Sequence, residues 1–280
     1  MTENNFDVIK NAKRIVIKVG TSTLTYANGN LNFRQMERLT KVLSDIKNSG
    51  REIIFVTSGA IGVGAGRLGL SERPRDTQGK QAAAAVGQCQ LMYFYDRYFE
   101  EFGHTTAQLL LTRDAIENDE RKANIINTLD RLLEYNAIPI INENDTVSID
   151  EIEFGDNDTL SAIIAVLADA DALILLTDID GLYTGDPRKD KNAQFIDAVS
   201  EINEDIRNQA GGAGTSRGTG GMNTKIHAAE IATAANIPTV IMDGSNPNRI
   251  YNLLDGEPVG TYFAQGAGSC SILHRIGDDE

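Results

Sequence analysis

The sequence Ile15-Val16-Ile17-Lys18-Val19-Gly20-Thr21-Ser22-Thr23 joins a run of aliphatic residues to a glycine and a short polar segment. Continuous aliphatic runs of this length are typical of strands that are buried on both faces of a parallel sheet. In open α/β sheets, ligands bind just beyond the carboxyl ends of such strands. This stretch therefore predicts an α/β fold, and it places Lys18 and the residues after it at a ligand-binding edge.

The same pattern recurs along the chain. Further aliphatic runs predict strands at Ile53–Thr57, Thr106–Leu111, Ile138–Asn142, Ala172–Thr177 and Thr239–Met242. Apolar residues recur at helical spacing between these runs, as in Leu39, Leu43 and Ile46. Strands that alternate with amphipathic helices predict a mostly parallel sheet that is covered by helices on both faces.

Polar, glycine-rich clusters follow several predicted strands at their carboxyl ends. They are Thr57-Ser58-Gly59-Ala60, Asn142-Glu143-Asn144-Asp145 and Thr177-Asp178-Ile179-Asp180-Gly181. Each cluster alone is also compatible with an ordinary turn, because Gly, Asn and Asp are common turn residues. Their recurrence at one predicted sheet edge favours a shared binding site.

Composition narrows the class of ligand. The 280 residues carry a formal net charge of −14, so we expect no nucleic-acid partner, because a phosphate backbone requires a basic face. A small anionic ligand remains compatible with this charge if a few cations and backbone amides gather locally. The two cysteines, Cys89 and Cys270, have no metal-ligand spacing, and apolar runs are too short to span a bilayer. We therefore expect a cytoplasmic protein.

Two segments contain the glycines of nucleotide-binding motifs. Gly64-Ala65-Gly66-Arg67-Leu68-Gly69 matches G-x-G-x-x-G, but no strand directly precedes it, so a dinucleotide site is disfavoured. The second segment, Gly218–Lys225, runs into a predicted helix, whose N-terminus and first-turn lysine are suited to bind an anion. By spacing alone, an ordinary flexible loop is an equally good interpretation of the second segment.

Taken together and in order, these segments resemble the amino acid kinase family, most of all its members that phosphorylate the glutamate side chain. The motifs that carry the resemblance are Ile17–Ser22, Val56–Ile61, Asn142–Asp145, Phe154–Asp158, Leu176–Asp178 with Gly181–Tyr183, and Gly218–Lys225. Several ordered motifs are far more specific than any single one. The resemblance implies a three-layer αβα sandwich around a mainly parallel sheet.

The resemblance also implies roles for individual residues. Lys18 and Lys225 match the lysines that neutralise the transferring phosphoryl group, and Asp158 matches the carboxylate that orients them. Substrate contacts are implied at Ser58, Gly59, Asn142, Asp145 and Asn157. Nucleotide contacts are implied at Lys18, Thr177, Asp178, Thr219, Gly220, Gly221, Met222, Asn223, Thr224 and Lys225, with Gly20 and Asp156 near the reacting groups. Alternatively, Asp156–Asp158 only caps a helix and Asp178–Gly181 is only a turn.

The implied reaction is ATP-dependent phosphorylation of L-glutamate to L-glutamyl 5-phosphate, the first step of proline biosynthesis. A glutamate side chain has a reference pKa of about 4.3, so the nucleophile is already ionised at neutral pH. Catalysis then consists of positioning and charge neutralisation, with Mg²⁺ held mainly by the ATP phosphates and no metal site built by the protein. Implied partners are proline as an inhibitor, glutamyl phosphate reductase as the next enzyme, and further copies of the chain in a homodimer or homotetramer.

We expect residues 1–280 to form a single kinase domain. The half at about 10–170 is expected to bind the amino acid, and the half at about 171–265 is expected to bind ATP. Many relatives carry a further PUA domain, which we do not expect here, because Ser271–Ile276 lacks the basic, Trp-containing character of its start.

Three alternatives stay open. The first is a sibling kinase that acts on another acid, such as N-acetylglutamate, aspartate, carbamate or a nucleoside monophosphate. The Gly20-Thr21-Ser22 and Ser58-Gly59-Ala60 segments favour glutamate over these, because the siblings usually carry glycine runs there. The second is a member without catalysis that serves as a sensor, and the third is a dinucleotide-dependent oxidoreductase. Retention of Lys18, Asp158 and Lys225 disfavours the second.

Overall fold

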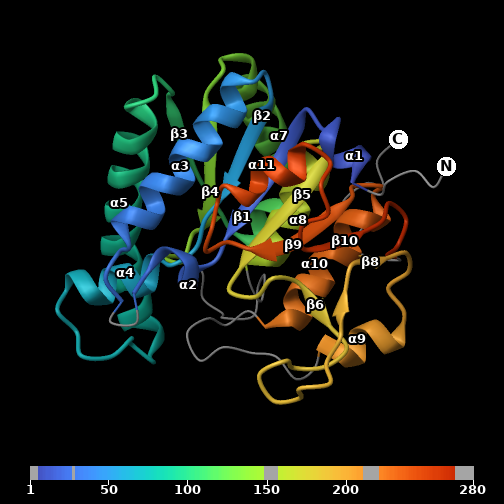
Figure 1. The fold of residues 1–280 in the computed structure, drawn as a ribbon. Helices are drawn as coiled ribbons and strands as arrows, with labels where there is room; N and C mark the ends of the chain where they lie inside the picture. Colours follow the sequence, from blue (N-terminus) through green and yellow to red (C-terminus); the bar gives the residue numbers. More distant parts are fainter. Residues whose placement is uncertain (1–5, 27–28, 148–156, 211–220, 269–280) are drawn as a thin grey trace.

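The computed structural model describes residues 6–26, 29–147, 157–210 and 221–268. Its main sheet has eight strands in the order β3-β4-β2-β1-β5-β9-β10-β8 (Figure 1). The strands are β1 (Arg14–Val19), β2 (Glu52–Val56), β3 (Thr106–Leu111), β4 (Ile138–Glu143), β5 (Ala172–Thr177), β8 (Ala198–Val199), β9 (Thr239–Asp243) and β10 (Thr261–Phe263). All neighbours are parallel except β9 and β10, so the predicted mainly parallel sheet is confirmed. A separate antiparallel pair joins β6 (Leu182–Tyr183) to β7 (Phe195–Ile196).

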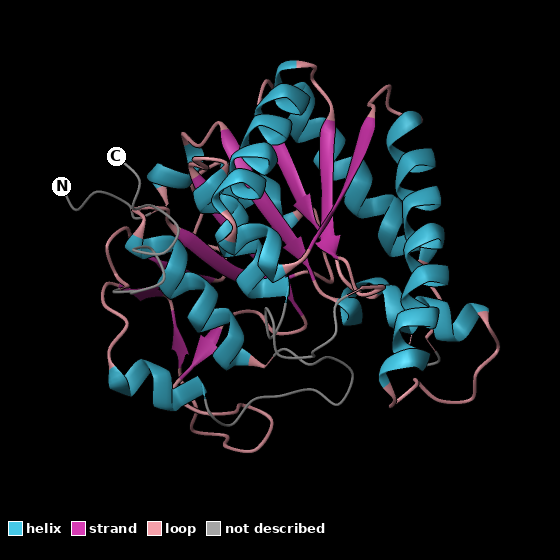
Figure 2. Cartoon of the chain, turned by 180° about the vertical axis from the view of Figure 1, so that it is seen from behind, coloured by secondary structure: helices cyan, strands magenta, loops and turns pink. Residues whose placement is uncertain are grey.

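Helices cover both faces of the main sheet. They are α1 (Asp7–Lys10), α2 (Thr21–Leu24), α3 (Phe33–Asn48), α4 (Ala60–Arg67), α5 (Thr77–Glu100), α6 (Arg113–Glu117), α7 (Asp119–Glu134), α8 (Asn157–Leu167), α9 (Glu204–Ala210), α10 (Met222–Ala234) and α11 (Arg249–Leu254). Buried side chains of α3, α5 and α11 form one hydrophobic cluster with the sheet, and those of α7, α8 and α10 form a second. Figures 1 and 2 show these two layers from opposite sides, which confirms the three-layer αβα sandwich.

Local sequence signals fix where the longer helices begin. The side chains of Asn32, Asp76 and Asn118 accept hydrogen bonds from backbone N–H groups in the first turns of α3, α5 and α7. Asn and Asp are preferred at this position because the first N–H groups of a helix have no partner within it. The caps thus set the start of each helix, and burial of its apolar face sets which side packs on the sheet.

Helices α4 and α5 approach each other so closely that two positions admit only glycine. A Cβ atom on Gly64 would lie 1.7 Å from the carbonyl oxygen of Ala83, and one on Gly87 would lie 1.8 Å from that of Ala60. Gly64 belongs to the G-x-G-x-x-G segment of the sequence, so its glycine serves helix packing here. The contact also fixes α5 relative to the loop before α4, which carries Ser58 and Gly59.

The aromatic residues in the second half of α5 do not form one packed helix face; they are Tyr93, Phe94, Tyr95, Tyr98 and Phe99. Tyr95 and Phe99 are fully buried, whereas Tyr93 is 57% exposed. Residues four apart share a helix face and residues two apart do not, so no single face can hold all five. Among the described helices, none is both long and apolar enough to cross a membrane.

Candidate active site

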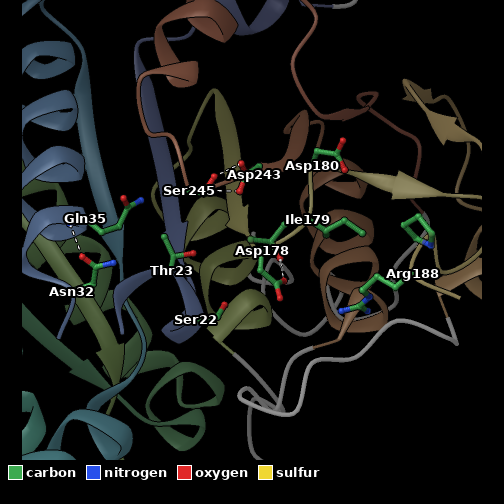
Figure 3. A pocket seen from close by; sticks show the side chains of 12 residues that line it. Ser22, Thr23, Asn32, Gln35, Asp178, Ile179, Asp180, Arg188, Asp243 and Ser245 are labelled. Atoms are coloured by element: carbon green, nitrogen blue, oxygen red, sulfur yellow. Dashed lines mark hydrogen bonds between the residues drawn. The ribbon is translucent and has the colours of Figure 1, made fainter. Parts of the chain in front are cut away.

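A cavity of about 610 Å³ opens at the carboxyl ends of β1, β5 and β9 (Figure 3). Ser22 follows β1, Thr177 ends β5 and is followed by Asp178, and Asp243 ends β9; all four line the cavity. Volumes of several hundred Å³ are typical of small-molecule sites. The cluster after β5 thus lies where the sequence predicts a ligand.

Among the described residues that line this cavity, Arg188 is the only cationic one. It reaches the cavity from the segment between β6 and β7 and donates a hydrogen bond from Nε to Asp186 Oδ1 over 3.0 Å. This hydrogen bond, together with the charge of Asp178, raises the pKa of the Arg188 guanidinium above its ordinary value. This positive charge can pair with a phosphate group, while the acidic residues of the same wall are Asp178, Asp180 and Asp243.

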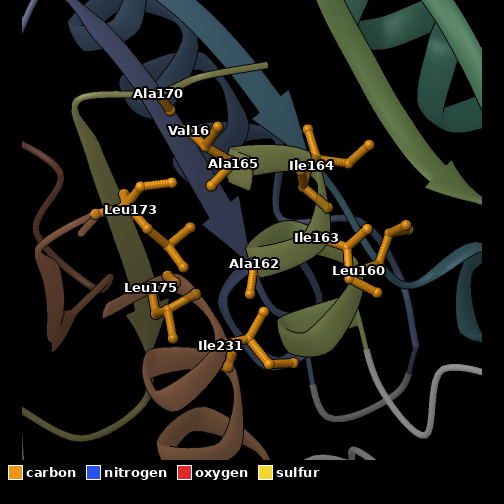
Figure 4. Close-up of a cluster of buried hydrophobic side chains, with 14 of the residues drawn as sticks. Val16, Leu160, Ala162, Ile163, Ile164, Ala165, Ala170, Leu173, Leu175 and Ile231 are labelled. Atoms are coloured by element: carbon orange, nitrogen blue, oxygen red, sulfur yellow. The ribbon is translucent and has the colours of Figure 1, made fainter. Parts of the chain in front are cut away.

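The alternation of side chains along β1 directs Lys18 toward α8 and α10. Ile15 and Ile17 belong to the hydrophobic cluster with α3, whereas Val16 packs with α8 and α10 on the opposite face (Figure 4). Residues two apart in a strand share a face, so Lys18 lies on the side of Val16. The regular pattern of a buried strand thus brings an ammonium group to the helix N-termini of that layer.

In this layer, Lys18 forms an ion pair with Asp158, which lies at the centre of a buried charged cluster. Its Nζ lies 2.5 Å from Asp158 Oδ1, in the first turn of α8, and Lys225 Nζ, in the first turn of α10, lies 2.9 Å from Asp158 Oδ2. Asp158 is fully buried, and Lys18 and Lys225 are only 3% and 7% exposed. The Thr224 hydroxyl also lies 2.9 Å from Asp158 Oδ2 and from the Gly221 carbonyl oxygen. We call Lys18, Asp158 and Lys225 the charged triad.

The charged triad carries two positive charges and one negative charge. The shared carboxylate lowers the repulsion between the two ammonium groups, but one unit of positive charge remains. Two ammonium groups around one carboxylate can attract a further anion, such as a phosphate oxygen. A Cβ atom placed on Gly20 would lie 3.8 Å from Lys18 Nζ and 4.0 Å from Ser22 Oγ, so Gly20 stands between the triad and the cavity wall.

A network of amide groups lies next to the triad, between β2 and β4. Asn157 Nδ2 lies 2.7 Å from the Thr57 carbonyl oxygen, 2.9 Å from Ser58 Oγ and 2.7 Å from Asn142 Oδ1. Asn157 directly precedes Asp158, so the start of α8 joins this network to the charged triad. The loops after β1 and β2 also touch. Gly59 has a left-handed φ of 100°, and its Cβ position lies 3.2 Å from Thr21 Cγ2.

Asp145 stands just beyond the end of β4 and is partly buried. Burial raises the pKa of its carboxyl group to about 6, and the charge of Arg73 opposes this only in part. Burial disfavours the ionised form of this carboxyl group, so a positively charged ligand beside it would stabilise the carboxylate.

The model of the amino acid kinase family matches residues 13–243. The chain belongs to the amino acid kinase family. The family predicted from the ordered motifs is thereby confirmed, and with it the prediction that the chain is a kinase. The matched residues include every strand from β1 to β9 and the whole charged triad.

Curated relatives within the amino acid kinase family are similar over most of the chain. Glutamate 5-kinase of Clostridium perfringens is 52% identical over 264 residues, covering 93% of this chain and 98% of that protein. Glutamate 5-kinase of Clostridium tetani is 51% identical, covering 94% of this chain and 98% of that protein. Glutamate 5-kinase of Carboxydothermus hydrogenoformans is also 51% identical, but this chain covers only 69% of it.

Two solved structures of low sequence identity share the fold. UMP kinase from Bacillus anthracis superposes with a TM-score of 0.64 at 17% identity, covering 91% of this chain and 96% of that chain. An isopentenyl phosphate kinase from T. acidophilum has a TM-score of 0.61 at 18% identity, covering 89% and 99%. At this level of identity, the likeness shows the shared sandwich fold alone.

Most family residues expected from the sequence gather at the carboxyl edge of the sheet. The structure brings together Lys18, Asp158 and Lys225, and beside them Ser58, Asn142 and Asn157. Thr177 and Asp178 lie at the cavity. Met222 is instead buried within the cluster of α8 and α10, and Asn223 is exposed. Thr219, Gly220 and Asp156 lie outside the described residues. The roles of all these residues stay predictions.

Sequence reasoning missed two polar residues of this edge. Arg188 lies in the cavity wall, in a segment without any motif. Gln88, on α5, has its Oε1 2.8 Å from Asn142 Nδ2. Gln88 stands four residues after Ala84 and three before Leu91, both of which are buried. A polar residue at an inward position of an otherwise apolar helix face was the signal that could have revealed it.

Proposed function

We propose that this chain transfers the γ-phosphoryl group of ATP to the side-chain carboxylate of L-glutamate, which gives L-glutamyl 5-phosphate and ADP. The observation that carries the proposal is the buried charged triad, with its excess positive charge, at the border between an open cavity and an amide-lined region. Curated relatives at 51–52% identity that bear the name Glutamate 5-kinase support the choice of substrate.

The charged triad suits a reaction between two anions. A carboxylate oxygen of glutamate attacks the γ-phosphorus, and the bond from that phosphorus to the bridging oxygen of ADP breaks. The nucleophile is ionised at neutral pH, so no base has to remove a proton. Lys18 and Lys225 lower the repulsion as negative charge gathers on the transferring group. Asp158 holds the two ammonium groups in place, and its shared position makes it an organiser of charge.

In this proposal, ATP and glutamate bind to different halves of the carboxyl edge of the sheet. ATP occupies the cavity beside Thr177 and Asp178, with Arg188 near its phosphates. Glutamate lies over Ser58, Gly59 and Asn157, where N–H and hydroxyl groups can bind its carboxylates. Asp145 pairs with the α-ammonium group, in a charge-assisted hydrogen bond. This division follows the expected halves at about 10–170 and 171–265 of one kinase domain.

Magnesium is expected as a companion of ATP. Among the described residues, no three His, Cys, Asp or Glu side chains are grouped as a metal site. Asp178 and Asp180 line the cavity and are the carboxylates placed to hold water molecules of a phosphate-bound ion. Such an ion fits these residues and would add positive charge beside the phosphates.

A sibling kinase acting on another acid is the second candidate. N-acetylglutamate lacks an α-ammonium group, so it would leave the Asp145 carboxylate without a counter-charge. UMP lacks one as well. Aspartate keeps the ammonium group but is one methylene shorter, which would place its side-chain carboxylate away from the triad. Asp145 therefore favours glutamate among these acceptors.

The test is ADP release with ATP and Mg²⁺, comparing L-glutamate with N-acetylglutamate, aspartate and UMP, with hydroxylamine present to trap an acyl phosphate. Lys225→Ala removes one lysine of the triad, and Lys41→Ala removes an exposed lysine of α3 as the matched control. We expect turnover with glutamate that is lost only in Lys225→Ala. ADP release with another acid would mean that this acid, and not glutamate, is the substrate. No ADP release with any acceptor would refute the kinase proposal.

The proposal includes further points that follow from the relatives' name and the motifs. The product feeds proline synthesis and passes to glutamyl phosphate reductase. Proline inhibits, acting through the loop at 145–154, most of which lies outside the described residues. The enzyme is cytoplasmic and forms a homodimer or homotetramer, which sedimentation can measure. Loop substitutions that leave proline inhibition unchanged would refute its placement there.

A further inference from the structure

We propose that Gln88 is a positioning residue for the acceptor substrate, acting through Asn142 on Asn157. The inference rests on the proposed function and adds to it a residue from α5, a helix that none of the site motifs includes. Gln88 is 7% exposed and lies directly after Gly87, at the close contact of α5 with α4. Its position is therefore fixed by the packing of the two helices.

Two backbone groups determine how the amides in this network face. The N–H of Glu143 can only donate, and it lies 2.9 Å from Asn142 Oδ1, so that end of Asn142 must be the oxygen. The carbonyl of Thr57 can only accept, and it lies 2.7 Å from Asn157 Nδ2, so that end of Asn157 must be the nitrogen. The orientation of both side-chain amides thus follows from the fixed roles of the backbone donor and acceptor.

The orientation of Gln88 follows from the same chain of contacts. Because Asn142 Oδ1 faces Glu143 and Asn157, Asn142 Nδ2 must donate to Gln88, whose Oε1 lies 2.8 Å away. Gln88 supplies the acceptor that holds the Asn142 side chain in place. Asn142 in turn accepts a hydrogen bond from Asn157 Nδ2. The side-chain oxygen of Asn157, Oδ1, then points away from all these acceptors. No other described group donates to that oxygen, which leaves it free to accept from a ligand.

The stability of the fold does not explain a glutamine at this position. Gln88 Nε2 is buried and makes no hydrogen bond with any described residue. An unsatisfied buried donor costs about 1–3 kcal/mol, and an apolar side chain of the same length would only exchange the unsatisfied Gln88 Nε2 for an unsatisfied Asn142 Nδ2. The role of Gln88 therefore lies in what its oxygen does for Asn142. Its effect should appear in binding of the acceptor and not in binding of ATP.

The experiment compares the KM for glutamate with the KM for ATP in two variants. Gln88→Met keeps the length of the side chain and removes the acceptor, and Gln90→Met on the same helix is the matched control. We expect Gln88→Met to raise the KM for glutamate roughly tenfold while the KM for ATP changes less than about twofold. Its unfolding midpoint should stay close to that of the parent, because one unsatisfied donor replaces another.

Two further variants separate positioning from other roles. In an Asn142→Ala background, Gln88→Met should have no additional effect, because a residue that acts through Asn142 cannot act without it. Gln88→Glu keeps the acceptor oxygen, and when protonated it also keeps a donor. Burial raises the pKa of such a carboxyl group, so its activity relative to the parent should be higher at pH 6 than at pH 8.

Each outcome supports or overturns the inference. Additive effects of Gln88→Met and Asn142→Ala, an equal rise of both KM values, or a lowered unfolding midpoint with unchanged KM values would overturn it. If the parent protein phosphorylates a different acid, the same comparison is made with that acid and tests Gln88 alone. If the parent has no acceptor-dependent turnover, the proposed function itself fails, and this inference falls with it.

Discussion

Two regions of the molecule bury lysine side chains, at opposite edges of the same sheet. At the carboxyl edge, Lys18 and Lys225 share the buried carboxylate of Asp158. At the amino edge, Lys47 lies in the last turn of α3 and is 6% exposed. Among the described residues, Lys47 forms no ion pair with a carboxylate. Its pKa is lowered by burial, and the charge of Glu52 offsets this only in part.

The difference shows that burial of a cation does not by itself define a site. The neighbour of Lys47 is His104, whose pKa is also lowered by burial, and whose ring lies 3.3 Å from the Ser44 carbonyl oxygen. Among the described residues, the charge of Glu52 favours the protonated ammonium group of Lys47, but burial outweighs it. At the triad, by contrast, a carboxylate holds two ammonium groups beside an open cavity. What distinguishes the carboxyl edge is a carboxylate that holds two ammonium groups together, next to a cavity in which a ligand can bind.

The largest effect is expected from removing one triad lysine. Lys225→Met and Lys18→Met should each lower kcat by about 10³-fold, because a donor that stabilises transition-state charge is lost from a site shielded from water. Steady-state ADP release measures this. Lys47→Met should leave kcat unchanged. If Lys47→Met lowered kcat by a similar factor, the two edges of the sheet would not differ in function, and the contrast drawn between them would be wrong.

Removing the shared carboxylate should act on stability. Asp158→Asn leaves two ammonium groups buried side by side, and breaking a buried ion pair in this way typically costs about 3–5 kcal/mol. Urea unfolding of the parent and the variant measures the difference. Added sulfate should stabilise Asp158→Asn more than the parent, because an anion can replace part of the lost charge. An unchanged unfolding free energy would mean that the lysines do not depend on Asp158.

Asp145 allows a test of pH dependence at the carboxyl edge. Its pKa of about 6 means that it loses its charge as the pH falls below 6, so the KM for glutamate should rise about tenfold per pH unit there. Asp145→Asn should raise that KM by about 10–100-fold at pH 7.5 and remove this pH dependence. A profile that is the same in both proteins would exclude Asp145 as the ammonium partner.

The same group makes an opposite prediction for stability. A carboxyl group whose pKa is higher in the folded state binds more protons there than in the unfolded chain between pH 3.8 and about 6. The contribution of Asp145 to stability therefore falls as the pH rises through this window. Asp145→Asn should unfold at a higher urea concentration than the parent at pH 7.5, although it binds glutamate less well.

Much of the fold could be predicted from periodicity. The stretch from Ile15 to Thr23 predicted β1 and placed Lys18 and the polar loop after it at the carboxyl edge, because a continuous aliphatic run followed by glycine marks a buried strand and its end. The short strands β8 and β10 were not predicted, since two or three residues carry no periodic signal. The antiparallel direction of β10 is likewise invisible in its three residues.

The site could be predicted only where it follows a motif. The charged triad was predicted as a set from the resemblance, but its geometry depends on how α8 and α10 pack on β1, which the sequence does not state. Gln88 was missed because a single polar residue on an apolar helix face gives no indication of what it contacts. Gly64 was matched to a nucleotide motif, yet its lack of a Cβ atom serves the contact with α5.

The smallest expected effect is the change in stability on replacing Lys47, at the amino edge of the sheet. Because the folded state lowers the pKa of Lys47, the unfolded chain binds more protons, and stability should rise with pH up to the ordinary lysine value of 10.5. Lys47→Met removes a buried charge that has no ion pair, so it should stabilise the fold at pH 7 by up to about 1 kcal/mol.

Urea unfolding at pH 7 and pH 9.5 measures this change in stability, with Lys41→Met as the exposed control. The advantage of Lys47→Met should shrink at pH 9.5, where the parent lysine loses its proton more readily. A destabilised Lys47→Met would mean that the amino edge holds its lysine through interactions as strong as those of the triad.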